Sequence, residues 1–299
     1  MRLPDFLVVG TARAGTTALH YQLRTHPQLF LPSQKEPCFF CFNGQIPNYK
    51  NAKFSFAVTD HEEYSELYIN AKANQLKGEI STPYLYLHNQ TIKNIQKFYS
   101  CRQLPMIVII LRNPFERAYS QYRWKVRDGR EKLSFEDALR NEEFRIEENF
   151  SFDYHYATRG LYAEAVKNFL DNFPKVKIVL YENYKYDFSS TMKKLCDFIG
   201  VDNDFNFNAT ANVNSSASTG YPVLNNLFFG ESNLKYRLLR KVPDNIRSNL
   251  KEKLIRFNNS GKKIPPVSEE AKEYLKNFYY HDILKLQSIT NFDLSNWLK

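Results

Sequence analysis

Apolar runs alternate with amphipathic stretches along most of this chain, and the alternation predicts strands that are followed by helices. Continuous apolar runs are typical of parallel strands, because both faces of such a sheet are covered. The clearest run is Met106 to Leu111, with sequence Met-Ile-Val-Ile-Ile-Leu. Further extended segments are predicted at 6–9, 29–31, 76–80 and 176–181. This order of strands and helices predicts an α/β fold with a parallel sheet.

Apolar positions at helical spacing predict the segments between the strands. The predicted helices are 16–26, 60–71, 91–99, 115–127, 134–148, 159–173, 188–199, 244–257 and 268–287. Asp60 with Glu63 forms a capping box, Pro114 suits a first helical position, and Gly200 suits a helix end. Residues 202–222 are rich in Asn, Ser and Thr, and we expect a functional loop there.

No repeat or low-complexity linker divides the chain. We therefore interpret residues 1–299 as a single domain. Its predicted fold class is α/β, a P-loop-like parallel sheet flanked by helices, with a helical C-terminal part.

The first strand leads into a small-residue loop and then a helix, an architecture that aims backbone N–H groups at a phosphate. Gly10 and Gly15 have the spacing of a nucleoside-triphosphatase loop, but Thr16 stands where such a loop has lysine. The basic residue is Arg13 instead. We predict an anion cradle at Ala14, Gly15, Thr16 and Thr17, with Arg13 supplying charge. An ordinary strand-to-helix turn is the alternative reading of this loop alone.

A second basic residue, Arg112, ends the strongest predicted strand, and Ser120 follows it on the next helix. Ligands of open α/β sheets bind at the carboxyl ends of strands, so Arg112 and Arg13 should share one edge. Two separated cations fit a mononucleotide with phosphates on both its 5′ and 3′ sides. The strand ends in Arg112 rather than Asp, which disfavours a magnesium-dependent kinase.

Composition narrows the classes of function. The 41 Lys and Arg against 32 Asp and Glu give a net charge of +9, which suits an anionic ligand. The chain has no block of five like charges, the pattern that would indicate a nucleic-acid-binding tail. It also has no run of 18 apolar residues, the pattern that would predict a membrane-spanning helix. The first strand begins close to Met1, so we expect no signal peptide and a cytoplasmic location, with neither nucleic acid nor membrane as partner.

The four cysteines give no strong metal or disulfide pattern. Cys38 and Cys41 form one C-x-x-C, but no second pair follows them. Reduced thiols and the absence of a metal are the simpler expectation.

These motifs together resemble those of sulfotransferases that use 3′-phosphoadenosine 5′-phosphosulfate (PAPS). The first loop is similar to the family's 5′-phosphosulfate loop, G-x-x-K-x-G-T-T or G-x-x-K-G-G-T, with Arg13 at the usual lysine. Arg112 with Ser120 looks like the family's 3′-phosphate site, where a guanidinium and a hydroxyl donate to one phosphate. Arg-Gly-Leu-Tyr at 159–162, the loop at 214–221 and the C-terminal 293–297 also resemble family landmarks.

The resemblance implies PAPS as the co-substrate, 3′-phosphoadenosine 5′-phosphate (PAP) as the product, and no metal. It extends the expected nucleotide site to Tyr162, Ser215 and Ser216.

The resemblance also implies catalytic residues. Lys-Glu-Pro-Cys-Phe-Phe at 35–40 looks like the K-E-x-x-F-F segment of the bacterial and heparan-sulfate branch, in which the glutamate acts as general base. Glu36 is therefore the expected base, with His88 as a weaker second candidate. Arg13 should act by charge and hydrogen bonding, because arginine does not give up its proton usefully. Cys38 and Ile80 depart from the pattern of several glycan-sulfating members, which have His and Lys at these positions.

We interpret the chain as a cytoplasmic sulfotransferase whose acceptor is a hydroxyl or amine of a small molecule. Looser similarity to cyanobacterial tailoring enzymes points to secondary metabolism, for example a saxitoxin-type alkaloid. Three alternatives stay open: a glycan sulfotransferase, a nucleotide kinase, and a nucleotide-binding protein without catalysis. The residues do not indicate the oligomeric state. We also expect Arg13→Lys to keep activity, since the family usually has lysine there.

Overall fold

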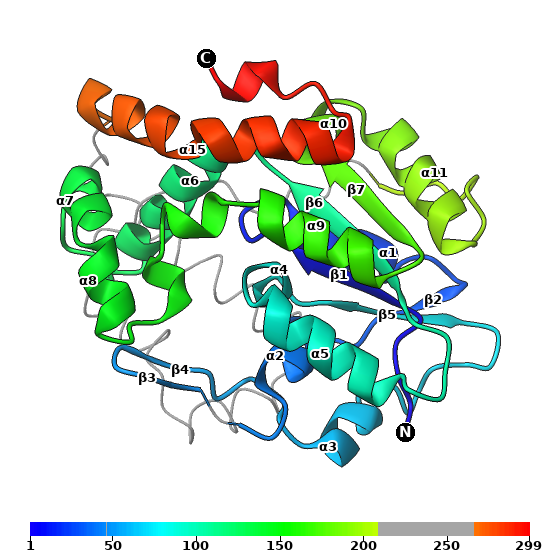
Figure 1. Cartoon of the computed structure of the whole chain (residues 1–299). Coiled ribbons are helices and arrows are strands. Elements are labelled where there is room, and N and C mark those ends of the chain that lie inside the picture. Colours follow the sequence, from blue (N-terminus) through cyan, green and yellow to red (C-terminus); the bar gives the residue numbers. More distant parts are fainter. Residues whose placement is uncertain (46, 209–265) are drawn as a thin grey trace, which may run out of the picture.

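The computed structural model describes residues 1–45, 47–208 and 266–299, and its centre is a five-stranded parallel sheet (Figure 1). The sheet consists of β1 (Phe6–Gly10), β2 (Leu29–Phe30), β5 (Leu76–Ile80), β6 (Met106–Leu111) and β7 (Val176–Leu180). A separate hairpin pairs β3 (Asn48–Tyr49) with β4 (Ala52–Lys53). The predicted α/β fold class, with a P-loop-like parallel sheet, is confirmed.

Helices connect these strands and flank the sheet. The α-helices are α1 (Thr16–Leu23), α2 (Phe39–Phe42), α3 (His61–Glu66), α4 (Pro83–Tyr86), α5 (His88–Phe98), α6 (Pro114–Arg127), α7 (Phe135–Arg140), α8 (Glu142–Glu147), α9 (Ala163–Asn172), α10 (Tyr181–Tyr186), α11 (Phe188–Ile199) and α15 (Glu269–Thr290). Three short 3₁₀ helices are η1 (Phe152–Tyr154), η2 (Thr158–Gly160) and η3 (Ser295–Trp297).

The strand order is β2-β5-β1-β6-β7, so β1 lies between β5 and β6. Val8 of β1 pairs with Ile80 on one side and with Val108 on the other. The chain first builds one side of β1 and then crosses to the other side. This reversal at β1 is the topological switch point at which open α/β sheets bind ligands.

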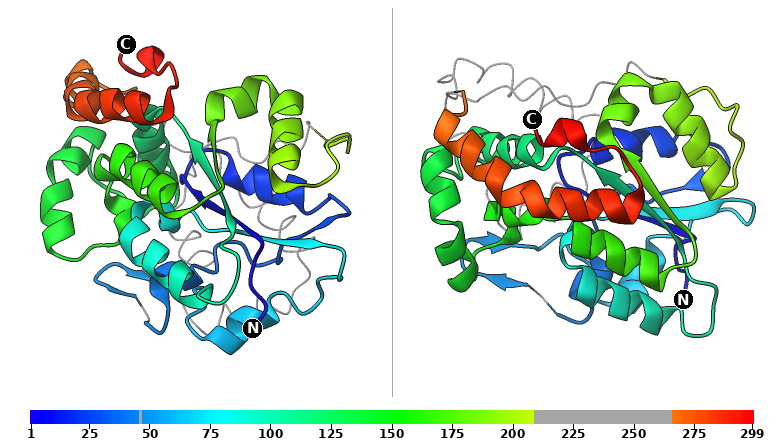
Figure 2. Two further views of the ribbon diagram at one scale, coloured as in Figure 1. Left: turned by 45° about the vertical axis from the view of Figure 1, so that its right-hand side comes forward. Right: turned by 45° about the horizontal axis from the view of Figure 1, so that its top comes forward.

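Both faces of the sheet are covered, which explains why its central strands are continuously apolar. Leu7 and Val9 pack into a cluster with α2, α4, α5 and α9. Phe6 and Val8 point to the other face, where α1 and α11 cover them. Figure 2 shows α15 passing alongside α9 on the first of these faces. Alternate side chains therefore enter two separate cores, as expected for a doubly covered sheet.

Several predicted helices differ in extent from the observed ones. The segment 134–148 forms two helices, α7 and α8, because Asn141 leaves helical geometry with ψ of 3°. The expected helix 60–71 ends at Glu66, after which the chain continues in tighter turns that bond each N–H to the third preceding carbonyl. The helix predicted at 244–257 and most of the loop at 202–222 lie outside the described residues.

Other boundaries follow the local chemistry as predicted. Asp60 caps α3 by accepting bonds from the N–H groups of Glu62 and Glu63, at 2.8 and 2.9 Å. Gly200 ends α11 in a left-handed conformation, with φ of 87°. Among the helices that the structure describes, none combines the length and apolar character needed to cross a bilayer.

Candidate functional site

The candidate site lies at the carboxyl ends of β1, β5 and β6. The loop after β1 carries Arg13, and the loop after β6 carries Arg112. The third side chain, Glu36, is attached to the end of β5, because its N–H donates to the carbonyl of Ile80 at 3.0 Å. The structure therefore places the three predicted side chains at the ends of three neighbouring strands.

The loop after β1 has a backbone that depends on Gly15. This residue has φ of 77°, a conformation that favours glycine, and it is the N-cap of α1. An added Cβ would come within 3.1 Å of Tyr181 and 3.2 Å of Tyr184. No side chain caps this end of α1. Its first N–H groups, at Thr16 and Thr17, are thus oriented as an anion site requires.

Arg13, Arg112 and Ser120 are joined by hydrogen bonds. The Nε–H of Arg13 donates to Ser120 Oγ at 3.2 Å. Arg112 donates from Nη1 to the backbone carbonyl of Arg13 at 2.8 Å. Burial, together with the nearby charges of Arg127 and Arg112, lowers the pKa of Arg13 to about 10. Even so, Arg13 stays charged near neutral pH, and these bonds hold two cationic residues and one hydroxyl next to one another.

Arg112 is held by further contacts on each side. Its guanidinium lies over the ring of Tyr181, with 4.8 Å between the central carbon and the ring centroid. Its Nη2 pairs with Glu116, one turn into α6, at 2.9 Å. The hydroxyl of Tyr162 donates to the carbonyl of Arg112 at 3.0 Å. Tyr162 is buried, and this bond ties it to the backbone of the predicted 3′-phosphate site.

Glu36 is fixed by both its backbone and its carboxylate. Its φ of 59° is left-handed, which is uncommon for a residue other than glycine. Lys35 forms an ion pair with the carboxylate, and Thr82 Oγ1 donates to Oε1 at 3.1 Å. The side chain nevertheless keeps 28% of its surface exposed. An accessible, oriented carboxylate of this kind can accept a proton from a bound molecule.

A second carboxylate, Glu79, lies on β5 but is not accessible. Its exposed fraction is 2%, and the hydroxyl of Tyr64 donates to it. Burial raises the pKa of this carboxyl group. Glu79 therefore belongs to the core beneath the edge, whereas Glu36 faces the region where a ligand would bind.

His88 lies apart from this cluster. It begins α5, and its Nδ1 lies 3.0 Å from Nδ2 of Asn168 on α9. Burial lowers the pKa of His88. Among the described residues no hydrogen bond joins it to Arg13 or Glu36. Ser215 and Ser216 lie outside the described residues.

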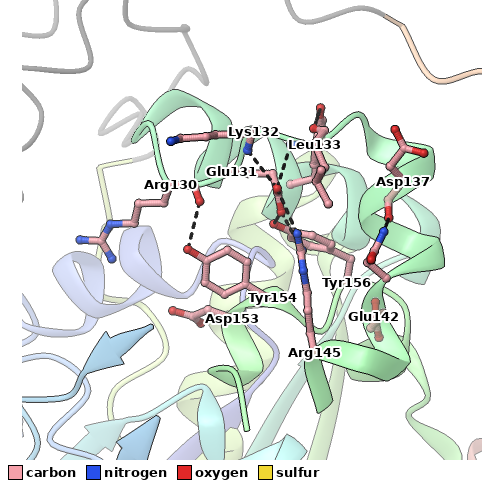
Figure 3. A network of polar contacts seen from close by, with 12 residues as sticks. Arg130, Glu131, Lys132, Leu133, Asp137, Glu142, Arg145, Asp153, Tyr154 and Tyr156 are labelled. Carbon is pink, nitrogen blue, oxygen red and sulfur yellow. Dashed lines mark hydrogen bonds and ion pairs between the residues drawn. The ribbon is translucent and has the colours of Figure 1, made fainter. Parts of the chain in front are cut away.

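A buried polar network supports the segment 150–160 beside the site (Figure 3). Glu131 accepts two bonds from Arg145, at 2.7 and 3.1 Å, and a third from the hydroxyl of Tyr156 at 2.8 Å. Glu142 accepts from the N–H groups of Ala157 and Thr158. Each carboxylate is thus paired within the protein, and the network fixes the segment that leads to Tyr162.

Two residues in the site had not been predicted from the sequence. Thr82 bonds to Glu36, and Trp124 lies with its ring centroid 5.7 Å from the guanidinium carbon of Arg13. Thr82 comes two residues after the predicted strand at 76–80, so its place at the carboxyl edge of the sheet could have been predicted from the sequence. Trp124 is four residues after Ser120 and therefore on the same face of α6, a signal that helical spacing alone offers.

The chemistry of these groups fits a phosphorylated nucleotide. An uncapped helix end and Arg13 suit one anionic group, and Arg112 with Ser120 suits a second. Because Glu116 already pairs with Arg112, an incoming phosphate would replace or share that contact.

Comparison with known proteins gives the family. The model of the sulfotransferase domain matches residues 3–282. A sulfotransferase crystal structure from Alicyclobacillus acidocaldarius is 26% identical, with a TM-score of 0.75 and 100% of both chains covered.

Two curated relatives are much longer proteins. The membrane-associated sulfotransferase kil1 of Dictyostelium discoideum is 30% identical over 124 residues, which is 42% of this chain and 23% of the relative. The human bifunctional heparan sulfate N-deacetylase/N-sulfotransferase 3 is 20% identical across 100% of this chain and 31% of its own length. The chain thus spans less than a third of either relative. With the family model matched over nearly all of its length, this chain belongs to the sulfotransferase family.

Proposed function

We propose that this enzyme transfers the sulfuryl group of PAPS to a hydroxyl or amine of a small molecule, with Glu36 as general base. The observation that carries the proposal is the arrangement at the carboxyl edge. Arg112 and Ser120 each hydrogen-bond to Arg13, and the partly exposed carboxylate of Glu36 lies at the end of the adjacent strand.

Each side chain has a role that its contacts support. PAPS supplies an activated sulfuryl group when it is bound. Arg112 and Ser120 would bind the 3′-phosphate, and the N-terminus of α1 the 5′ side. Arg13 would stabilise the negative charge that grows on the leaving oxygen. Glu36 would take the acceptor proton, while Thr82 and Lys35 hold its carboxylate in place.

The small acceptor is supported by the two positions that depart from the glycan-sulfating pattern. Cys38 is fully buried and Ile80 is 1% exposed, so neither offers a polar group to a sugar chain. A cytoplasmic metabolite, with a saxitoxin-type alkaloid as one example, is the acceptor class we propose. A heparan-type glycan is the second candidate, because the alignment with the human relative covers the whole chain.

The direct test is transfer of radiolabelled sulfate from PAPS to a panel of acceptors. The panel holds simple alcohols, phenols and amines, guanidinium alkaloids and desulfated heparan chains. We expect labelled product from at least one small acceptor and none from Glu36→Gln within the same time. Labelling of the glycan alone would select the second candidate. PAP binding without transfer to any acceptor would indicate a binding protein.

A further inference from the structure

Trp124 and Ser120 hold Arg13 from two successive turns of α6. Ser120 Oγ accepts the Nε–H of Arg13 at 3.2 Å, and the Trp124 ring lies 5.7 Å from the guanidinium carbon. That separation is within the range of a cation–π contact. The two residues are four positions apart, so they lie one above the other on the helix. Together they hold the guanidinium at two points, its Nε and its central carbon.

We propose that Trp124 is a positioning residue that makes this site specific for arginine at position 13. The inference rests on the proposed function, because the oriented group is the cation expected at the leaving oxygen. It revises the expectation that Arg13→Lys keeps activity.

The reason lies in the shape of the two cations. A guanidinium is planar and carries five N–H donors. With Nε bonded to Ser120 and its guanidinium carbon over the Trp124 ring, Arg13 keeps its terminal N–H groups for a ligand. A lysine has one nitrogen, whose donors would be divided between Ser120 and the leaving oxygen. Its compact ammonium also lacks the flat group that stacks on an aromatic ring.

The indole is itself held firmly. Lys125 Nζ lies 4.9 Å from the Trp124 ring centroid and 4.5 Å from that of Tyr154. The same ammonium pairs with Asp153 at 3.3 Å and is buried. Tyr154 and Asp153 belong to the supported segment shown in Figure 3. A ring that is fixed in this way can orient a neighbour more precisely than a mobile surface side chain can.

A kinetic double-mutant cycle separates positioning from simple packing. Arg13→Lys and Trp124→Leu are each expected to lower kcat about tenfold, with the KM for PAPS changed less than about threefold. The double variant should be no slower than either single variant, because both changes remove the same orientation. Trp124→Phe should recover most of the activity. The proposal would be overturned if the effects of the two single substitutions multiply in the double variant, or if Arg13→Lys keeps the wild-type kcat.

Tyr119→Leu provides a matched control. Tyr119 is on the same helix and also lies within cation–π distance of an arginine, Arg123, at 5.8 Å. Its ring packs against Phe135 of α7, with 5.3 Å between the ring centroids. We expect the kcat of Tyr119→Leu to stay within about twofold of the wild-type value, because the packing of α6 against its neighbours does not by itself orient Arg13. A loss equal to that of Trp124→Leu would show that any aromatic on α6 matters equally, which contradicts the proposal.

A spectroscopic test needs no activity. The chain holds two tryptophans, Trp124 and Trp297, so Trp297→Phe leaves Trp124 as the only emitter. In that background Arg13→Ala should move the emission maximum to longer wavelength, because it uncovers the indole to water. Arg24→Ala, at the far end of α1, should not. An unchanged spectrum for Arg13→Ala would overturn the inference. Absence of sulfate transfer by the wild type would instead reject the proposed function.

Discussion

The two halves of the site are built in different ways. On the side that we propose binds the nucleotide, Arg112 and Ser120 each bond to Arg13, and all three lie on strand–loop–helix units that the sheet fixes. On the proposed acceptor side, Glu36 lies on an irregular segment with left-handed backbone and is held by Lys35 and Thr82. The first half suits a constant ligand with two anionic groups. The second half rests on few contacts around one carboxylate.

This difference suggests that the two halves can be altered separately. Changes on the nucleotide side should act on PAP affinity or on leaving-group stabilisation. Changes at Glu36 should act on proton removal alone. Substitutions on each side of the site test that separation.

Glu36→Gln should lower turnover by about 10² to 10⁴ on a hydroxyl acceptor, because the amide cannot accept a proton. PAP affinity should stay nearly unchanged. Single-turnover transfer at saturating PAPS measures the effect, and Glu36→Asp should recover little because its carboxylate is withdrawn. A rate within threefold of wild type for Glu36→Gln would remove Glu36 from the mechanism. If Lys35→Ala and Glu36→Gln cause equal, modest losses of turnover, the two residues form only a structural ion pair.

Arg13→Ala should lower kcat by about 10² to 10³, the usual loss when one donor to a developing negative charge is removed. Melting temperature should change little. PAP affinity should fall, because the 5′-phosphate of PAP loses its contact to Arg13, but binding should persist through the Arg112 and Ser120 contacts to the 3′-phosphate. Steady-state kinetics with PAPS varied, alongside a thermal melt, distinguish these quantities. Near-normal turnover would show that the charge of Arg13 plays no part in catalysis.

Arg112→Ala should weaken PAP binding by roughly tenfold or more, the worth of one charge-assisted hydrogen bond. Binding of adenosine 5′-phosphosulfate, which lacks the 3′-phosphate, should weaken much less. Isothermal titration of both nucleotides gives the comparison. If both weaken equally, Arg112 supports the edge in general and does not bind the 3′-phosphate.

Tyr162→Phe should have the smallest effect, a weakening of PAP binding by about threefold. The change removes the hydroxyl that donates to the carbonyl of Arg112 and keeps the buried ring. Adenosine 5′-phosphosulfate affinity is the internal control. A loss as large as that of Arg112→Ala would mean that Tyr162 contacts the nucleotide directly.

The sequence was informative where structure is local. The apolar run at 106–111 predicted β6, and the short units after β1 and β6 placed Arg13, Arg112 and Ser120 at one edge. Contacts between distant segments had no such signal. The bond from Thr82 to Glu36 and the contact of Trp124 with Arg13 depend on how strands and α6 pack together. The break between α7 and α8 at Asn141 likewise cannot be predicted from the helical periodicity of the sequence.

The most direct measurement of the central claim is the affinity of the wild-type chain for PAP and for adenosine 5′-phosphate. We propose that the carboxyl edge binds a nucleotide at two phosphates, one at the N-terminus of α1 and one at Arg112 and Ser120. We therefore expect PAP to bind at least about tenfold more tightly than adenosine 5′-phosphate, because only PAP carries the 3′-phosphate. Equal dissociation constants for the two nucleotides would contradict it.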